Sequence, residues 1–170
     1  FRRVLFRSLN KTLFRGLIAA LCVFATPGFA AEPAGAIASY SRKAKFEDVR
    51  DDLKAAIENR GLVIDYQSFV HRMLERTGKD VGSARPIYRD AQAFVFCSAA
   101  LSRKAMEADP ANVAICPYSI SVHETVAEPG RIVVSYRRPV RPDGSPASRA
   151  ALQEVDRLLD GIAREAIGQP

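Results

Sequence analysis

The clearest pattern in the sequence is YSISVHETVAEPGRIVVSY, residues 118–136. Apolar residues take every second position on both sides of a Pro-Gly pair: Tyr118, Ile120 and Val122 before it, and Ile132, Val134 and Tyr136 after it. A period of two is typical of strands that bury one face, and Pro-Gly is typical of a turn. The stretch therefore predicts two antiparallel strands joined as a hairpin.

Two amphipathic helices are predicted, one before the hairpin and one after it. The first covers 45–60, where apolar residues recur at spacings of three and four: Phe46, Val49, Leu53, Ala56 and Ile57. Gly61 then supplies a left-handed stop. The last helix starts at Ser145, has Pro146 in its first turn and runs to Gly168. Its apolar stripe consists of Leu152, Val155, Leu159, Ile162 and Ala166.

Shorter segments complete the chain between these elements. We predict strands at 39–44, 62–66 and 91–97, helices at 69–77 and 99–108, and a loop at 78–87. The order is then β-α-β-α-β-α-β-β-α, without a run of regular βαβ units. This order predicts a single α+β domain over 39–168, with one antiparallel sheet and flanking helices.

The first thirty residues have the pattern of a secretory signal. Residues 1–15 contain basic residues and no acid, 16–25 (GLIAALCVFA) are uncharged and mostly apolar, and Gly28 and Ala30 are the small residues that signal peptidase requires. We expect cleavage after Ala30, a flexible start over 31–38, and a periplasmic or secreted protein. Residues 1–8, FRRVLFRS, look like a translated sequencing adapter, and we expect them not to be native.

The positive charge of the chain is concentrated in this leader. The 25 Lys and Arg residues exceed the 19 Asp and Glu residues by six, so the formal net charge is +6. Without the five basic residues of 1–30, 20 basic residues remain against 19 acidic ones, a net charge of +1. A nearly neutral body leaves little counterion release to drive nucleic-acid binding. We therefore expect no nucleic-acid partner and no membrane anchor after cleavage, and the oligomeric state stays open.

Several stretches together resemble a known family: SRKAKFEDVRDDLKAAIENRGLVI at 41–64, FVFCSAALSRKAMEADP at 94–110 and ICPYSISVHE at 115–124, followed by Gly130 and RIVVSYRRP. Their order is similar to that of the bacterial domain of unknown function family 302, over about 39–167. The resemblance implies a curved antiparallel sheet flanked by helices, akin in outline to the TATA-binding-protein-like fold. It implies no reaction and no catalytic residue. Many members place a cysteine after the hairpin proline, whereas here Cys116 precedes Pro117.

Cys97 and Cys116 are the cysteines that remain after cleavage. Each lies at the end of a predicted strand, on opposite sides of the same helix, so the two side chains can meet at one end of the sheet. Three alternatives stay open: a structural disulfide that closes a loop of about 20 residues, two separate buried thiols, or a redox or metal-binding pair. His123 shares the strand face of Ser119 and Ser121, so we expect it to be exposed and no metal to be bound. A site of Cys97, Cys116 and His123 is the alternative.

The basic segment RRPVRP, residues 137–142, joins the hairpin to the last helix. It is either a soluble connector or a contact for an anion or an acidic partner, made by Arg137, Arg138 and Arg141. The patterns of phosphate loops, nucleophile elbows, zinc proteases and thioredoxins are absent from the sequence. We therefore favour a protein without enzymatic activity and expect no cofactor.

Two classes of function remain. The first is a secreted or periplasmic accessory module that binds a small ligand or a partner protein. The second is a thiol-dependent redox or metal-handling protein that uses Cys97 and Cys116. Reactive free thiols would favour the second class, and unreactive sulfurs would favour the first.

Overall fold

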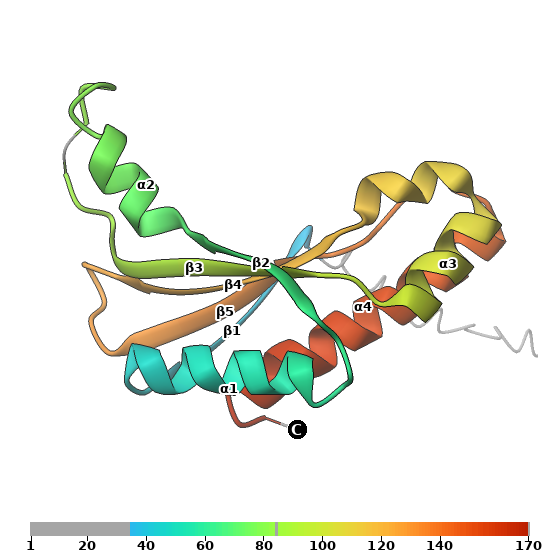
Figure 1. The fold of residues 1–170 in the computed structure, drawn as a ribbon, viewed down its shortest axis with the longest axis horizontal. Coiled ribbons are helices and arrows are strands. Elements are labelled where there is room, and N and C mark those ends of the chain that lie inside the picture. Colours follow the sequence, from blue (N-terminus) through green and yellow to red (C-terminus); the bar gives the residue numbers. More distant parts are fainter. Residues whose placement is uncertain (1–34, 84, 170) are drawn as a thin grey trace, which may run out of the picture. The chain divides into compact units, whose positions relative to one another are not determined.

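The computed structural model describes residues 35–83 and 85–169, and the predicted signal and adapter lie outside this part of the chain. The elements are, in chain order, β1 (Ile37–Lys43), α1 (Phe46–Glu58), β2 (Ile64–Phe69), α2 (Val70–Thr77), β3 (Tyr88–Phe96), α3 (Ala99–Ala108), the 3₁₀ helix η1 (Pro110–Ile115), β4 (Tyr118–Thr125), β5 (Arg131–Arg137) and α4 (Pro146–Ala166), as Figure 1 shows. The predicted α+β fold and its order are confirmed, with η1 as an addition.

The strands form one antiparallel sheet in the order β1-β5-β4-β3-β2. The predicted hairpin is confirmed, because β4 pairs with β5 and places Ile120 opposite Tyr136. Gly130 in its turn has a φ of +79°, which glycine adopts without a steric penalty.

The first strand begins earlier than predicted. β1 starts at Ile37, inside the stretch 31–38 that the sequence predicts to be flexible. Ile37 pairs with Arg137 of β5, and this partner is too distant in sequence for a local pattern to reveal it. The flexible interpretation is therefore wrong for residues 37 and 38.

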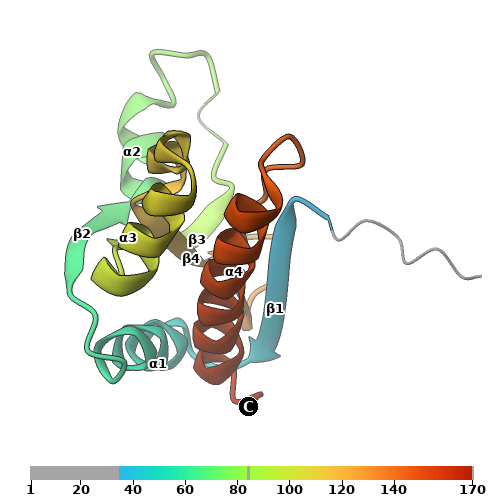
Figure 2. The ribbon, with the colours of Figure 1, turned by 90° about the vertical axis from the view of Figure 1, so that its right-hand side faces the viewer.

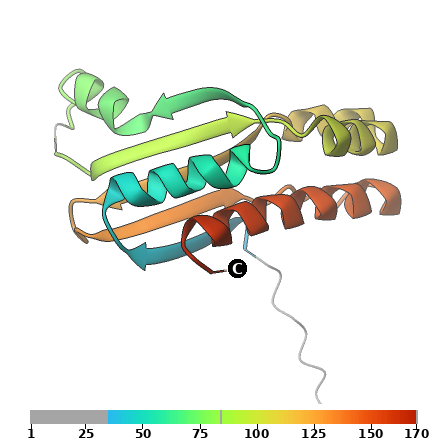
Figure 3. The ribbon, with the colours of Figure 1, turned by 60° about the horizontal axis from the view of Figure 1, so that its bottom comes forward.

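Helices α1 and α4 cover the same face of the sheet, as Figures 2 and 3 show. The strands contribute fully buried side chains to this core: Phe94, Phe96, Ile120, Val122, Ile132 and Val134. The helices contribute the predicted stripes: Val49, Leu53 and Ile57 from α1, and Val155, Leu159 and Ile162 from α4. Burial of these apolar faces against each other is the main force that holds the helices on the sheet.

Helices α3 and η1 lie beyond one end of the sheet, and α3 packs on α4 (Figures 1 and 3). Ala105 forms a second, smaller core cluster with Ala151 and Leu152 of α4. Beside it the buried Asn112 of η1 donates hydrogen bonds to the Ala105 carbonyl at 2.8 Å and to Ser148 Oγ at 2.9 Å. Part of α4 thus belongs to the main core and part to this smaller cluster.

The other face of the sheet, called the open face below, is covered by neither α1 nor α4 (Figure 2). Helix α2 packs on β3 but has no buried residue of its own. His71 of α2 accepts a hydrogen bond from the Ala91 backbone N–H at 3.2 Å, so it contacts the sheet rather than lying on a solvated helix face. None of the helices in residues 35–83 and 85–169 has the length and apolar character that a membrane span requires.

Candidate functional site

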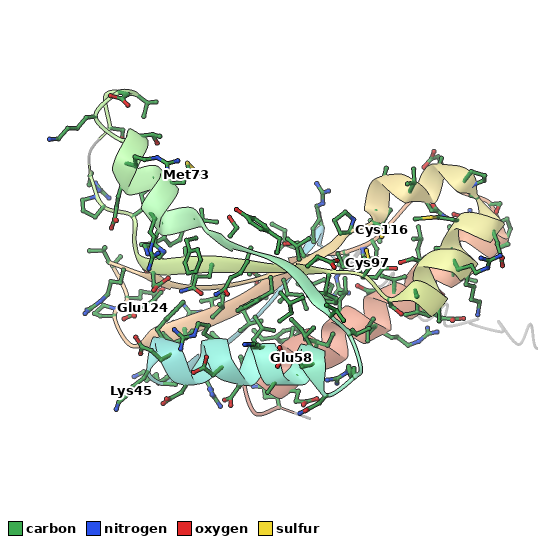
Figure 4. All side chains as sticks on the ribbon, viewed as in Figure 1. Lys45, Glu58, Met73, Cys97, Cys116 and Glu124 are labelled. Carbon is green, nitrogen blue, oxygen red and sulfur yellow. The ribbon has the colours of Figure 1, made fainter. Side chains whose placement is uncertain are left out.

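The two cysteines predicted as a candidate site meet at one end of the sheet, as Figure 4 shows. Cys97 directly follows β3 and Cys116 directly follows η1, and their Sγ atoms lie 2.7 Å apart. Strand pairing brings them together, since Phe96 lies opposite Tyr118 in the β3–β4 ladder. Both are free thiols at a distance longer than a disulfide bond, so the first of the three alternatives, the disulfide, is not formed in this structure.

The groups that act on the two thiols are uncharged or negative. Burial, followed by the hydrogen bond and the charge of Cys116, raises the pKa of the Cys97 thiol to about 11, and Asp65 acts in the same direction. The hydroxyl of Ser102 lies 3.5 Å from Cys116 Sγ and 3.0 Å from the hydroxyl of Tyr118. A thiol with a raised pKa is almost fully protonated at neutral pH and is a poor nucleophile. This environment disfavours rapid thiol catalysis.

His123 does not join the cysteines. It lies in β4 on the open face, seven positions along the chain from Cys116, which corresponds to roughly 20 Å in a strand. Its ring packs edge-on against Tyr88, and burial, together with the charge of Arg131, lowers the pKa of His123. The described residues hold no group of three or more His, Cys, Asp or Glu side chains that could bind a metal. The alternative site of Cys97, Cys116 and His123 is therefore not assembled, and His123 is half-buried rather than fully exposed.

The three arginines of the basic connector have different surroundings. Arg138 Nη1 donates to Asp156 at 2.7 Å, and Arg141 Nη1 donates to Asp109 at 2.8 Å. These two guanidinium groups are thus committed to carboxylates of the protein itself. Arg137 is exposed at the end of β5 and has no ion-pair partner among the described residues. Of the three predicted anion contacts, the geometry leaves Arg137 available.

The open face carries an arrangement that the sequence did not reveal. Strand register places five small side chains in one row across all the strands: Ser39, Ser135, Ser121, Ala93 and Ser68. Within this row, Ser121 Oγ lies 2.9 Å from Ser135 Oγ. A neighbouring row consists of Ser41, Val133, His123 and Ala91. Neither row contains a Lys, Arg, Asp or Glu, and the first row consists only of serine and alanine side chains.

Comparison with known proteins gives a family and a fold. The family model described as "Domain of unknown function DUF302" matches residues 38–166. The chain belongs to the DUF302 family. The comparison with curated proteins gave no match.

A solved DUF302 structure has the same fold. The crystal structure of an uncharacterized conserved DUF302 protein from Bacillus stearothermophilus superposes with a TM-score of 0.65, at 12% sequence identity. The match covers 78% of this chain and 99% of that one. At this identity the likeness establishes the fold of the DUF302 domain and leaves activity to be argued from the residues.

Three recesses in the described part of the chain are small, and a fourth, over Arg103, Met106 and Glu107 of α3, holds about 480 Å³ but is shallow and open to solvent. One between α2 and the loop before β3 holds about 130 Å³, one beside Pro117 about 80 Å³, and one between 139–142 and α4 about 260 Å³. Sites for drug-sized ligands usually hold about 300–1,000 Å³. The three smaller recesses lie below this range, and the larger one is too open to enclose a ligand, which favours the partner-protein form of the predicted binding module over the small-ligand form.

Proposed function

We propose that this DUF302 chain is a secreted or periplasmic accessory module that binds a partner protein on the open face and has no catalysis of its own. The observation that carries this proposal is the row of short, neutral side chains that the register builds across the whole sheet. Short side chains let a flat protein surface approach closely, and a neutral face avoids the desolvation cost of buried charges.

The location outside the cytoplasm is supported by the sequence alone. The acid-free basic start, the apolar run at 16–25 and the small residues Gly28 and Ala30 form the three parts of a cleavable signal.

The chemistry of the partner follows from the rim of the face. Arg137 is the exposed arginine at the end of β5, beside the rows of serines. A positive side chain at a rim guides association with a partner of opposite charge. The proposed partner is therefore a protein with a flat, neutral surface and an acidic side chain that meets Arg137.

Photocrosslinking in the producing cells tests the proposed surface. We would place benzoylphenylalanine at Ser119, which is exposed at the start of β4, and at Lys54, which is exposed on α1. We expect one discrete adduct from position 119 and none from position 54. Equal adducts from both positions, or none from position 119, would contradict the proposal. An adduct of twice the chain mass would identify a second copy as the occupant and overturn the assignment of a different protein.

A charge reversal tests the predicted chemistry of the partner. Arg137→Glu should reduce the adduct from position 119 at least about 10-fold, because repulsion replaces attraction at the rim. Lys45→Glu is the matched control, since Lys45 is exposed at the N-terminus of α1 (Figure 4). Equal loss of the adduct in both variants would show that the Arg137 contact is not specific.

Thiol-dependent redox or metal handling is a second candidate function. The distance of 2.7 Å between Cys97 Sγ and Cys116 Sγ favours it. The raised pKa of Cys97 opposes it, because the thiolate is the form that attacks disulfides and binds metals. Titration of the native protein with a thiol reagent at pH 7 separates the two functions. Complete reaction within seconds would favour the thiol function, and slow reaction would favour the binding module.

A further inference from the structure

We propose that Cys97 and Cys116 are a modification site, at which a disulfide oxidant converts the two thiols into an internal bond that fixes α3 and η1 to the sheet. This inference concerns the end of the sheet and is independent of the binding function proposed for the open face.

The backbone already holds the two sulfurs in position. Cys97 and Cys116 lie next to the pair formed by Phe96 and Tyr118, the last pair of the β3–β4 ladder at this end. The Sγ atoms are 2.7 Å apart, and a disulfide bond is about 2.05 Å long, so the sulfurs need to move by only about 0.7 Å. This movement is small beside the spacing of about 4.8 Å between paired strands, so we expect the strands to keep their register.

The reaction consumes one external disulfide. One cysteine thiolate attacks that disulfide, forms a mixed disulfide and releases the first small thiolate. The other cysteine then loses its proton to solvent and attacks the protein sulfur of the mixed disulfide, which expels the second small thiolate. Two protein thiols are oxidised, and the external disulfide takes up their two electrons and ends as two thiols. Oxidised glutathione is a suitable oxidant of this class.

The bond would stabilise the segment that leaves the sheet between β3 and β4. This segment contains α3 and η1, and its two ends are the positions of Cys97 and Cys116. A cross-link between these ends removes conformational freedom from the unfolded chain. For a loop of about 20 residues, we expect the oxidised protein to melt about 10 °C above the reduced one.

Peptide mapping of the full chain gives a direct test. The reduced protein is incubated with oxidised glutathione, free thiols are blocked, and the protein is digested with trypsin without reductant. We expect peptide 90–103 joined to peptide 105–131, which together contain Cys97 and Cys116. Cys22 falls in the separate peptide 16–42 and does not affect the result. Absence of the joined peptide after complete reaction of the thiols would overturn the proposal.

Serine variants test whether the bond between Cys97 and Cys116 stabilises the protein. In Cys97→Ser and in Cys116→Ser, the partner cysteine should carry only a glutathione adduct, and oxidation should not raise the melting temperature. Both variants stay informative if their folds are weakened, because each is compared with itself in the reduced and oxidised states. A joined peptide in the original protein with an unchanged melting temperature would show that the bond does not fix the segment, and it would overturn this part of the proposal.

Discussion

At the scale of single residues, Asp160 is an acid that ties α4 to the sheet. It accepts hydrogen bonds from the Tyr40 hydroxyl, from Arg164 Nε at 2.7 Å and from the Tyr136 hydroxyl at 3.4 Å. Burial alone would raise the pKa of Asp160, but the hydrogen bonds from Tyr40 and Arg164 outweigh burial and hold this pKa below its usual value. A carboxyl whose pKa falls on folding stabilises the fold above its unfolded pKa, and this contribution is lost as the pH falls through the folded pKa.

We therefore predict a pH-dependent effect of Asp160→Asn. At pH 7 the variant should lose about 1–2 kcal/mol of unfolding free energy, because neutral hydrogen bonds replace charged ones. The difference from the original protein should shrink below about pH 4, where the unfolded carboxyl is protonated. Denaturant melts at pH 7, 5 and 3 measure this. Glu107→Gln, at an exposed pair with Arg103, should change stability by less than about 0.5 kcal/mol. A loss that is constant from pH 7 to pH 3 would contradict the role of the Asp160 charge.

Residue predictions succeeded where the signal was local. The alternation in β4 correctly placed His123 on the face opposite Ile120 and Val122. The partners of Arg138 and Arg141 lie 18 and 32 positions away in sequence, so a local reading of RRPVRP could not identify them. The cysteine contact was predictable in spite of its range, because both residues lie at the ends of predicted strands on opposite sides of one helix, and the structure confirms that they meet.

At the scale of elements, α4 is one of the two helices that complete the main core. Leu159 is 2% exposed and belongs to the main core cluster with Val155 and Ile162. We predict that Leu159→Ala lowers the unfolding free energy by about 2–5 kcal/mol, because the truncation leaves a cavity between α4 and the sheet. Urea melts measure the loss. Arg157→Ala, at an exposed position of the same helix, should stay within about 0.5 kcal/mol. A Leu159→Ala loss below about 1 kcal/mol would show that the helix is peripheral.

The periodicity of the sequence predicted the types of the elements better than it predicted where they begin and end. The hairpin and both long helices were predictable, because each shows several repeats of its period. The ends of β2 differ from the prediction: the strand runs from Ile64 to Phe69, whereas the sequence predicts 62–66 with a helix from 69. The pairing of Ser68 with Ala93 and of Phe69 with Gln92 extends the strand, and that pairing depends on a distant segment. Local sequence patterns also could not predict the register of the strands across the sheet. The row of serines depends on that register, so it could not be predicted either.

At the scale of the whole molecule, the charge distribution predicts that nucleic acid binds weakly. Residues after 30 have a net charge of +1, and the serine rows of the open face contain no arginine or lysine. We predict no binding of a 20-base-pair duplex or its single strands at 0.15 M salt by the chain that begins at Ala31, with a dissociation constant above about 100 μM. Fluorescence anisotropy checks this. Binding that weakens steeply with added salt would refute the prediction.

Both core clusters contain residues of α4, so one cluster can open locally while the other stays packed. Helix α4 has 21 residues, and Leu152 serves the smaller cluster while Val155 and Leu159 serve the larger one. A small cluster opens at lower free energy than a large one, because less apolar surface has to meet water. We therefore expect the amide protons around the smaller cluster to exchange with solvent before those of the sheet, while Leu101 and Ile115 keep the other side of the α3–η1 segment on the main core.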